Sequence, residues 1–466
     1  MSQAARKQAQ QTRPAGKSSR LGQRWDWPIL VVCAISALTV GLLSAANTSQ
    51  HAWGLFAAAG YACATLSAAR SPTPWPRTAA VIAVTGAAAL PLLYLTAIGR
   101  AQMEVGVVER AAGLLFSSGT PYNSAPHAVR DFNPYLPGMA LFGTPHLLFG
   151  ESPFSSARLW FLAGFLGALA GAVRALTKNR TIDAHPADGT AHRITARTGA
   201  LWLTACPVVA LPLSIGGVDP PVIALICLAL AYTDQGSAIR AGLAVGVAAA
   251  LKWTAWPAIP VVIAVFAAVA GKRAAVKCAL TATTIAALAI LPAALVDGSA
   301  SYQNVVLYPL GLGPTASSAQ SPLLGHLIIS LVPDGKTVTM VLIALSAVGT
   351  AISLLVRPPR TTTAAADRLA LGLTLAILLS PATRIGYAIY PIVLVIWPRF
   401  TARLSISRPH LRASEPPHGR RTLEYAAQPG PMVSLGQSQL SGRSGSPSSG
   451  NVSCVCTTVC DMPLSA

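Results

Sequence analysis

Charged residues are scarce in this sequence: 11% of its 466 residues are Asp, Glu, Lys or Arg, and 53% are hydrophobic. A soluble domain carries about a quarter charged residues, so the composition excludes a soluble protein of this length. Apolar runs recur from Pro28 to Trp397, and about 20 apolar residues cross a bilayer. Because backbone polar groups in lipid must be bonded within their own segment, we expect an all-α polytopic transmembrane helical bundle of about twelve spans.

Acidic residues are the rarer of the two charge types, with 15 Asp and Glu against 34 Lys and Arg and a net charge of +19. The basic residues lie mainly between the apolar runs and in the tails, where they orient a membrane protein rather than bind nucleic acid. We therefore expect the membrane as a partner and no nucleic acid. Residues 1–27 hold six basic residues and Asp26, which predicts a cytoplasmic N-terminal tail.

The sequence also lacks the motifs of several enzyme classes. No H-x-x-x-H, G-x-x-x-x-G-K or G-x-S-x-G pattern occurs, which argues against metalloprotease, P-loop and serine-hydrolase chemistry. Eight cysteines form no framework. Five lie in apolar runs, and Cys454, Cys456 and Cys460 lie close together near the C-terminus. No disulfide or metal site is implied, and we expect no cofactor.

Three regions follow from the changes in composition. Residues 1–27 form the basic tail, residues 28–398 the bundle with an outer loop at 99–134, and residues 399–466 a tail rich in Ser, Gly, Pro, Arg and Gln. The last region cannot bury a core, so we expect it to be disordered. Alternatively, a change of reading frame in the gene would explain the composition of residues 399–466. Cleavage of a signal peptide after Ala46 is a minor alternative to a first span.

The stretch from Gln102 to Gly138 is the longest polar interruption among the apolar runs, and it holds Glu104, Glu109 and Asp131. Assigning a side to each loop places it on the outer face, as a folded surface loop. The same assignment puts Asp219, Lys252 and Arg384 on that face. Ionisable groups near bilayer depth are costly and mark function when they cluster. The alternatives are snorkelling for Lys252 and Arg384 and helix N-capping for Asp219.

Carboxylates, cations and aromatic rings at one face of a membrane bundle suit the transfer of a sugar from a lipid phosphate carrier. A carboxylate takes the proton of an acceptor hydroxyl as it attacks the anomeric carbon. Cations hold and neutralise the departing phosphate. Aromatic side chains stack on a sugar ring, and Tyr122, Tyr135, Trp253 and Trp256 are the candidates.

Four segments carry a resemblance to a known family: S-G-T-P-Y, F-N-P-Y-L-P-G-M-A-L-F-G, Ala241 to Pro257, and L-S-P-A-T-R-I-G-Y-A-I-Y-P. With an acidic residue in the first outer loop, they make residues 78–398 resemble the GT-C glycosyltransferases, in particular the actinobacterial polyprenyl-phosphomannose-dependent mannosyltransferases related to those that elongate phosphatidylinositol mannosides. The resemblance implies a plasma-membrane GT-C bundle, a polyprenyl-phosphate sugar donor, a lipid or glycan acceptor and an inverting transfer.

The resemblance also assigns roles to residues. The acidic position of the family is an aspartate and corresponds here to Glu104, with Glu109 five residues further on and Asp131 as another candidate base. The residues expected to contact substrate are Tyr122, Asn133, Tyr135, Asp219, Lys252, Trp253, Arg384 and Tyr387. A transporter or flippase of a lipid-linked precursor remains an alternative, although no internal repeat supports it. A non-catalytic membrane scaffold is a third possibility.

Overall fold

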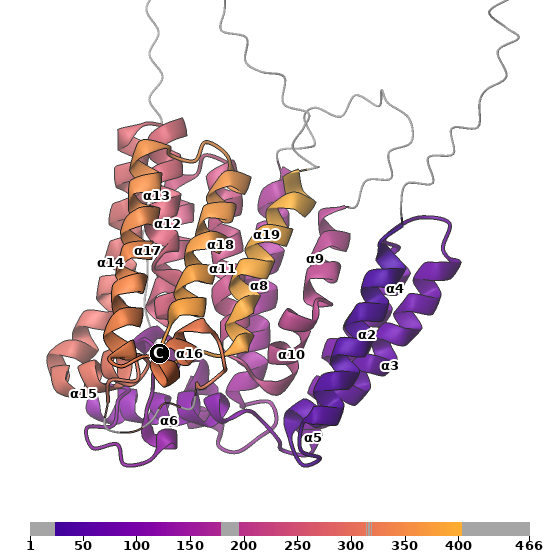
Figure 1. The fold of residues 1–466 in the computed structure, drawn as a ribbon, viewed down its shortest axis with the longest axis horizontal. Helices are drawn as coiled ribbons and strands as arrows, with labels where there is room; N and C mark the ends of the chain where they lie inside the picture. Colours follow the sequence, from indigo (N-terminus) through magenta and orange to yellow (C-terminus); the bar gives the residue numbers. More distant parts are fainter. Residues whose placement is uncertain (1–23, 179–194, 314, 316, 318, 403–466) are drawn as a thin grey trace, which may run out of the picture. The chain divides into compact units, whose positions relative to one another are not determined.

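The structure, a computed structural model, describes residues 24–178, 195–313, 315, 317 and 319–402, which form helices joined by loops (Figure 1). No strand occurs among them, and the prediction of an all-α polytopic membrane protein is confirmed. Residues 403–466 lie outside the described residues, as do residues 1–23, so the expectations for the two tails stay predictions.

Seven helices of the described residues are long and apolar enough to cross a membrane. They are α2 (Asp26–Leu43), α3 (Ser49–Arg70), the continuous run α4 (Arg77–Val84), η1 (Thr85–Ala89) and α5 (Leu90–Ala97), α8 (Ala157–Lys178), α14 (Lys272–Val296), α17 (Gly335–Val356) and α18 (Thr362–Leu379). A further pair, α9 (Ala196–Thr204) and α10 (Pro207–Ile215), is bent by 64° and counts as an eighth span if taken together.

Four further helices are shorter, with 12 to 16 residues each: α11 (Asp219–Asp234), α12 (Ala238–Leu251), α13 (Ala258–Val269) and α19 (Ile389–Ala402). The number of helices that cross the bilayer stays a prediction. The remaining elements are α6 (Met103–Ser118), η2 (Val129–Asp131), η3 (Pro137–Gly143), α7 (Thr144–Phe149), η4 (Trp253–Ala255), α15 (Gly298–Tyr302), η5 (Gln303–Leu307), α16 (Leu324–Leu331) and η6 (Ile385–Ala388).

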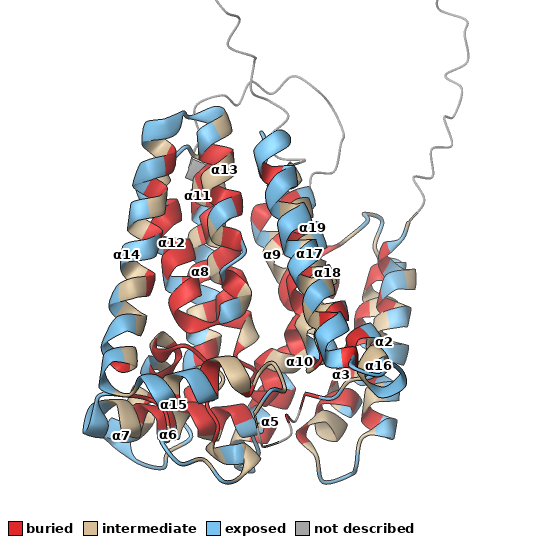
Figure 2. Cartoon of the chain, turned by 60° about the vertical axis from the view of Figure 1, so that its left-hand side comes forward, coloured by how far each residue is buried: buried red, intermediate tan, exposed pale blue. Residues whose placement is uncertain are grey.

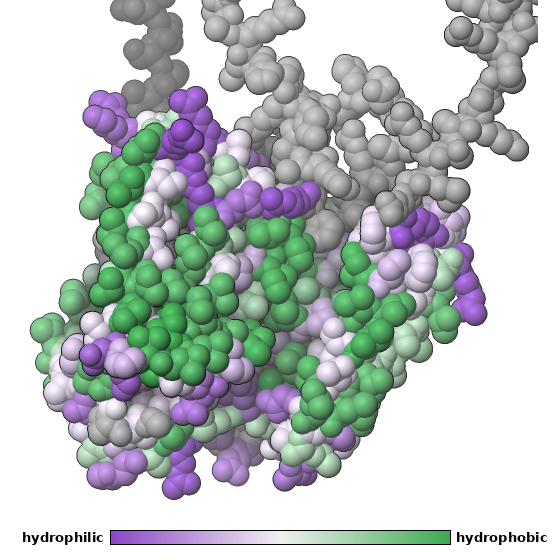
Figure 3. All heavy atoms as spheres, viewed as in Figure 1, coloured by the Kyte–Doolittle hydropathy of each residue, from purple (hydrophilic) through white to green (hydrophobic). Residues whose placement is uncertain are grey.

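The most buried helix is α11, which packs against α8 and α12 (Figure 2). Its buried side chains occur on every face and include the consecutive residues Val222, Ile223 and Ala224, as expected for a helix enclosed by others. The outer helices differ, because α14 and α17 expose large apolar side chains such as Leu288 and Leu345. Figure 3 shows these apolar residues as a band between two hydrophilic ends, the distribution that a bilayer requires.

Small residues let the N-terminal helices approach closely. A methyl group at Gly54 of α3 would lie 2.4 Å from the Gly41 Cα of α2, and one at Gly60 would lie 2.6 Å from the Gly86 Cα of η1. Such glycine contacts allow backbones to meet and are common between membrane helices. They explain why α3 packs against both α2 and the α4–η1 segment.

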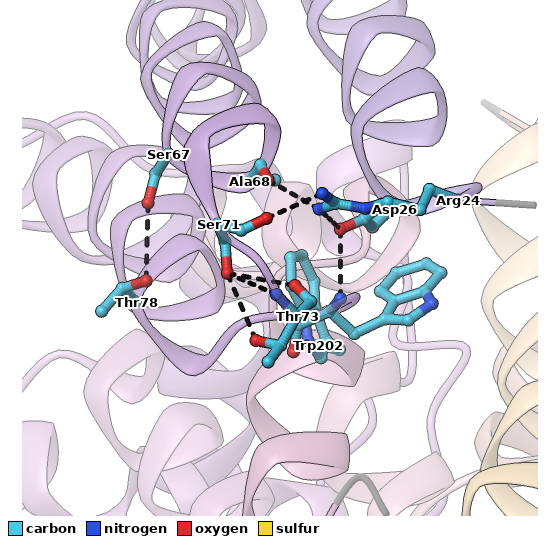
Figure 4. Close-up of polar contacts among 9 residues, drawn as sticks. Arg24, Asp26, Ser67, Ala68, Ser71, Thr73, Thr78 and Trp202 are labelled. Atoms are coloured by element: carbon cyan, nitrogen blue, oxygen red, sulfur yellow. Dashed lines mark hydrogen bonds and ion pairs between the residues drawn. The ribbon is translucent and has the colours of Figure 1, made fainter. Parts of the chain in front are cut away.

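An ion pair and backbone contacts fix the start of α2 against the turn between α3 and α4 (Figure 4). The Arg24 guanidinium donates to Asp26 Oδ2 at 2.9 Å and to the carbonyls of Ala68 and Ser71 at 2.7 Å each. Asp26 is fully buried, and its Oδ2 also accepts from the Trp75 amide at 3.1 Å. The first helix is therefore tied to the rest of the fold at the end opposite α6 (Figure 1).

Candidate functional site

The predicted outer loop begins as a helix, α6, which lies at one end of the bundle (Figure 1). The Gln102 amide donates to the Ile215 carbonyl at 2.8 Å, which fixes the start of α6 against the end of α10. Gly119 ends the helix in the left-handed conformation, at φ +79°, which glycine adopts without strain. The expectation of a surface loop is therefore corrected for this half of the segment.

Glu104, in the first turn of α6, pairs with Arg384. The guanidinium donates to Oε1 of the carboxylate, and the exposed fractions of the two side chains are 9% for Glu104 and 30% for Arg384. The second oxygen, Oε2, is buried and has no hydrogen-bond partner within the described residues. The pair thus fixes the carboxylate by one oxygen and leaves a buried acceptor, which is costly unless a further group supplies a proton.

A second ion pair lies in the same part of the fold. Lys252 Nζ donates to Asp219 Oδ1 at 2.6 Å, and the Tyr390 hydroxyl donates to the same oxygen at 2.6 Å. Thr254 donates to the Tyr390 hydroxyl at 2.7 Å. The expected capping role of Asp219 is wrong. The N-cap of α11 is Val218, whose side chain has no acceptor atom, and the Asp219 carboxylate accepts from Lys252 and Tyr390 instead.

The position of Lys252 follows from the break between α12 and η4. Its backbone is extended, at φ −158° and ψ 145°, directly after the last helical residue, Leu251. The Leu136 amide donates to the Leu251 carbonyl at 3.1 Å, so the end of the stretch from Gln102 to Gly138, here called the outer segment, packs on the end of α12. The ammonium lies 5.6 Å from the ring centre of Tyr135 and 4.6 Å from that of Tyr387, within the range of cation–π attraction.

Both ion pairs line one cavity of about 590 Å³. Glu104, Asp219, Lys252 and Arg384 form its charged part, and Tyr135 and Tyr387 also line it. A second, largely apolar part is formed by α2, α3 and α10, through residues that include Ala37, Val40, Trp53, Val208, Leu211 and Ile215. The arrangement can hold an anionic group and an apolar chain within one continuous space.

The other two predicted acids, Glu109 and Asp131, accept hydrogen bonds from backbone amides. Glu109 Oε1 accepts from the Ala157 amide at 2.9 Å, so Glu109 caps the start of α8. Asp131 Oδ2 accepts from the His127 and Ala128 amides at 3.2 and 2.8 Å. These two backbone hydrogen bonds lower the pKa of Asp131 below its usual value of 3.8. Neither acid lines the cavity that holds Glu104.

Three of the residues expected to contact substrate also lie outside that cavity. The Tyr122 hydroxyl donates to the Tyr135 carbonyl at 3.0 Å, and burial raises the pKa of Tyr122. Asn133 receives the Tyr135 amide on Oδ1 and donates to the Pro121 carbonyl. Trp253 donates to the Val305 carbonyl at 3.0 Å. Tyr122 and Asn133 thus hold residues 121–135 in shape, whereas Trp253 joins η4 to η5.

Residues that sequence reasoning missed include Tyr390, Thr254 and the cavity walls on α2 and α3. Tyr390 follows Tyr387 by three residues, a spacing that places both on one helical face and could have indicated a shared role. The walls on α2 and α3 carry no polar signal that distinguishes them from ordinary spans. Within residues 24–178, 195–313 and 319–402, no three His, Cys, Asp or Glu side chains lie together as metal ligands would.

The model of glycosyltransferase family 87 matches residues 133–381, which is more than half of the sequence. No curated protein and no solved structure matches the chain. The matched segment contains Tyr135, Asp219 and Lys252, whereas Glu104 precedes it and Arg384 lies three residues after its end.

Proposed function

This chain belongs to glycosyltransferase family 87, and from that membership we propose that it transfers mannose from a polyprenyl-phosphate donor to a lipid or glycan acceptor at the outer face of the plasma membrane. Family membership indicates a glycosyltransferase, and the apolar helices make it a membrane protein of GT-C-like type. The donor, the sugar and the acceptor are the proposal. One observation carries it: a single cavity joins Glu104, Lys252 and Arg384 to an apolar part formed by α2, α3 and α10.

Glu104 is the proposed base. Its buried Oε2 has no hydrogen-bond partner in the described part of the chain. An acceptor hydroxyl that donates to this oxygen would supply the missing hydrogen bond, which is favourable for a buried acceptor. As the hydroxyl oxygen bonds to the anomeric carbon, its proton passes to Glu104. The bond between the anomeric carbon and the phosphate oxygen breaks, and the phosphate leaves with the electron pair. The attack opposite the leaving group inverts the anomeric carbon.

Lys252 and Arg384 are the proposed phosphate contacts. Both side chains line the cavity and each is now paired with a carboxylate, Lys252 with Asp219 and Arg384 with Glu104. A bound phosphate offers each cation a second anionic partner, and hydrogen bonds between ionised groups are the stronger kind. Movement of Arg384 toward the phosphate would release Glu104 Oε1 at the moment when a base is needed. Asp219 and Tyr390 then keep Lys252 in place.

The apolar part of the cavity is the proposed place of the polyprenyl chain. Val40 of α2 and Val208 and Leu211 of α10 line it, and they can accept an apolar chain without leaving a polar group unpaired. Tyr135 and Tyr387 lie at the charged part, beside Lys252. The sugar would lie against these rings, between the phosphate contacts and Glu104.

The test is a transfer assay with the full chain in lipid nanodiscs. We expect radiolabelled polyprenyl-phosphomannose and a membrane lipid extract to yield a mannosylated product and free polyprenyl phosphate in equal amounts. Sealed vesicles distinguish the rival function: donor that crosses the bilayer without forming product would favour a transporter or flippase. Absence of product with mannose, while another polyprenyl-phosphate sugar reacts, would change the sugar and keep the class of reaction.

A further inference from the structure

Arg158, in the first turn of α8, is a buried cation that pairs with no acid. Its exposed fraction is 3%, and no carboxylate lies within 4.0 Å of it among the residues that the structure describes. Arg158 does not line the cavity that holds Glu104, Lys252 and Arg384. Burial of an unpaired cation is costly, and membrane proteins keep such residues where they serve function.

The Arg158 guanidinium joins the end of α5 to the loop before α6. Its Nη1 donates to the Thr96 hydroxyl at 3.3 Å, and its Nη2 donates to the Arg100 carbonyl. Thr96 lies in the last turn of α5, and Arg100 precedes Gln102, the N-cap of α6, by two residues. The two donor groups therefore hold both sides of the loop that leads the chain to Glu104.

The stem of Arg158 reaches this loop over Gly216, which directly follows α10. A methyl group at Gly216 would lie 3.4 Å from Arg158 Cγ and 2.4 Å from Val105 Cγ2, and the φ of Gly216 is +92°. Glycine accepts both this backbone conformation and so close an approach. Because Val105 directly follows Glu104, the Arg158 stem and the first turn of α6 pack on the same glycine.

Four helix ends meet around Arg158: the ends of α5 and α10 and the starts of α6 and α8. The Gln102 amide donates to the Ile215 carbonyl at 2.8 Å, which ties the start of α6 to the end of α10. The C-terminal end of a helix carries partial negative charge. Arg158 contacts the end of α5 through its guanidinium and the end of α10 through its stem, which gives a physical reason for a buried cation without a carboxylate.

The place of the Glu104 carboxylate depends on how firmly this loop is held. Glu104 lies two residues after Gln102, and its ion pair with Arg384 uses Oε1 alone, since Oε2 has no hydrogen-bond partner among the described residues. A single contact at the tip of a side chain does not fix the backbone that carries it. Misplacement of a reacting group by about 1 Å costs up to about 100-fold in rate.

We propose that Arg158 is a positioning residue for sugar transfer, which holds the loop before α6 so that the Glu104 carboxylate meets the acceptor hydroxyl in the cavity. The inference rests on the proposed function, since it concerns the proposed base. Arg158 touches no substrate and acts through Glu104. Lysine is a poor substitute, because one compact ammonium does not reproduce the fixed fork with which a guanidinium reaches two acceptors.

The first test is the split between kcat and KM in the transfer assay, with rates expressed per folded protein. Arg158→Gln should lower kcat roughly 10- to 100-fold and leave KM for the donor within about twofold, because the proposed phosphate contacts are unchanged. Arg158→Lys and Thr96→Val, the milder changes, should each lower kcat less. Arg174→Gln is the matched control, since Arg174 is exposed on the same helix. Equal kcat values for Arg158→Gln and Arg174→Gln would overturn the proposal.

A double variant separates positioning from a general loss of structure. In Glu104→Gln the base is absent, so the addition of Arg158→Gln should cause little further fall in kcat. A residue that only stabilises the fold would lower kcat by the same factor in both backgrounds. Such a multiplied loss in the double variant would contradict the proposal.

Hydrogen exchange in nanodiscs tests the positioning without any transfer of sugar. In Arg158→Gln, the Gln102 amide and the amides of residues 105–108 should exchange about tenfold faster, since a hydrogen bond from a charged donor is lost nearby. Amides 226–230 of α11 should keep the parent rates. If this change occurs but the parent transfers no sugar, the positioning stands and the proposed function fails. If residues 102–108 exchange as in the parent, the positioning is wrong, whether or not sugar is transferred.

Discussion

Arg384, at the start of η6, and Glu104, in the first turn of α6, form an ion pair although 280 residues of sequence separate them. The contact joins the predicted outer segment to the connection between α18 and α19. Both residues line the cavity that also holds Lys252 and Asp219. The four side chains come from four separate parts of the chain, and Glu104 reaches the other three because α6 lies at this end of the bundle.

Replacement of Arg384 tests the phosphate contact. We expect Arg384→Gln to lower kcat/KM for the polyprenyl-phosphate donor roughly 10- to 100-fold, because a hydrogen bond between ionised groups contributes about 1.5–3 kcal/mol. Arg384→Lys should retain part of this, since the charge remains. Arg357→Gln, an exposed change just after α17, is the control. An unchanged kcat/KM in Arg384→Gln would remove this residue from the site.

The buried pair of Lys252 and Asp219 should show coupling in stability. Lys252→Met leaves the Asp219 carboxylate without its cation, which costs about 3–5 kcal/mol when a buried pair is broken. The double variant Lys252→Met with Asp219→Asn should recover much of this loss, while remaining inactive because the phosphate contact is gone. Thermal unfolding in detergent measures the coupling. Additive losses in the double variant would show that the two residues do not interact.

The turn at residues 127–131 should lose order in acid. The pKa of Asp131 is lowered in the fold by the amides of Ala128 and His127, so its stabilising contribution is present above the ordinary value of 3.8 and is lost as pH falls through the lower folded value. Hydrogen exchange of residues 127–131, corrected for the intrinsic pH dependence, should be constant from pH 7 to 5 and rise below pH 4. Asp131→Ala, which removes the acceptor oxygen, should exchange fast at every pH. A parent-like profile in that variant would contradict the assignment.

The glycine contact between α2 and α3 should be intolerant of side chains. Gly54→Val places a side chain against the Gly41 backbone, where even a methyl group would lie at 2.4 Å, and overpacking costs typically 1–3 kcal/mol. We expect a lower unfolding temperature and weaker donor binding, because α2 and α3 line the apolar part of the cavity. A methyl group at Gly349 of α17 would meet no atom within 4 Å, so Gly349→Val serves as the control. Equal effects of the two changes would contradict this packing.

Much of the fold could be predicted from hydropathy, because spans are long apolar runs bounded by charge. The break at Lys252 was also predictable, since basic residues at both ends of the run 241–271 require the chain to turn back within it. The pairing of Asp219 with Tyr390 was not, because it joins positions 171 residues apart. The cavity walls formed by α2 and α3 could not be predicted either, for a different reason. Side chains that line an apolar cavity and side chains that face lipid are of the same apolar types.

The two glutamates of α6 show where the site prediction needed geometry. Five residues separate Glu104 from Glu109, which places their side chains about 140° apart around a helix. One therefore meets Arg384, and the other meets the start of α8. The sequence names both as candidate bases, and only the packing of α6 tells which of them lines the cavity. The catalytic role of Glu104 stays a prediction.

The rate of mannose transfer by Glu104→Gln, set against Glu109→Gln, tests the account most directly. The two changes are chemically identical and lie on the same helix, but only Glu104 lines the cavity with Lys252 and Arg384. We predict that Glu104→Gln lowers kcat roughly 10²- to 10⁴-fold, the usual contribution of a general base. Glu109→Gln should keep kcat near that of the parent and lower only the unfolding temperature, through the weakened cap of α8. Equal rates in the two variants, both folded and inserted, would contradict the account.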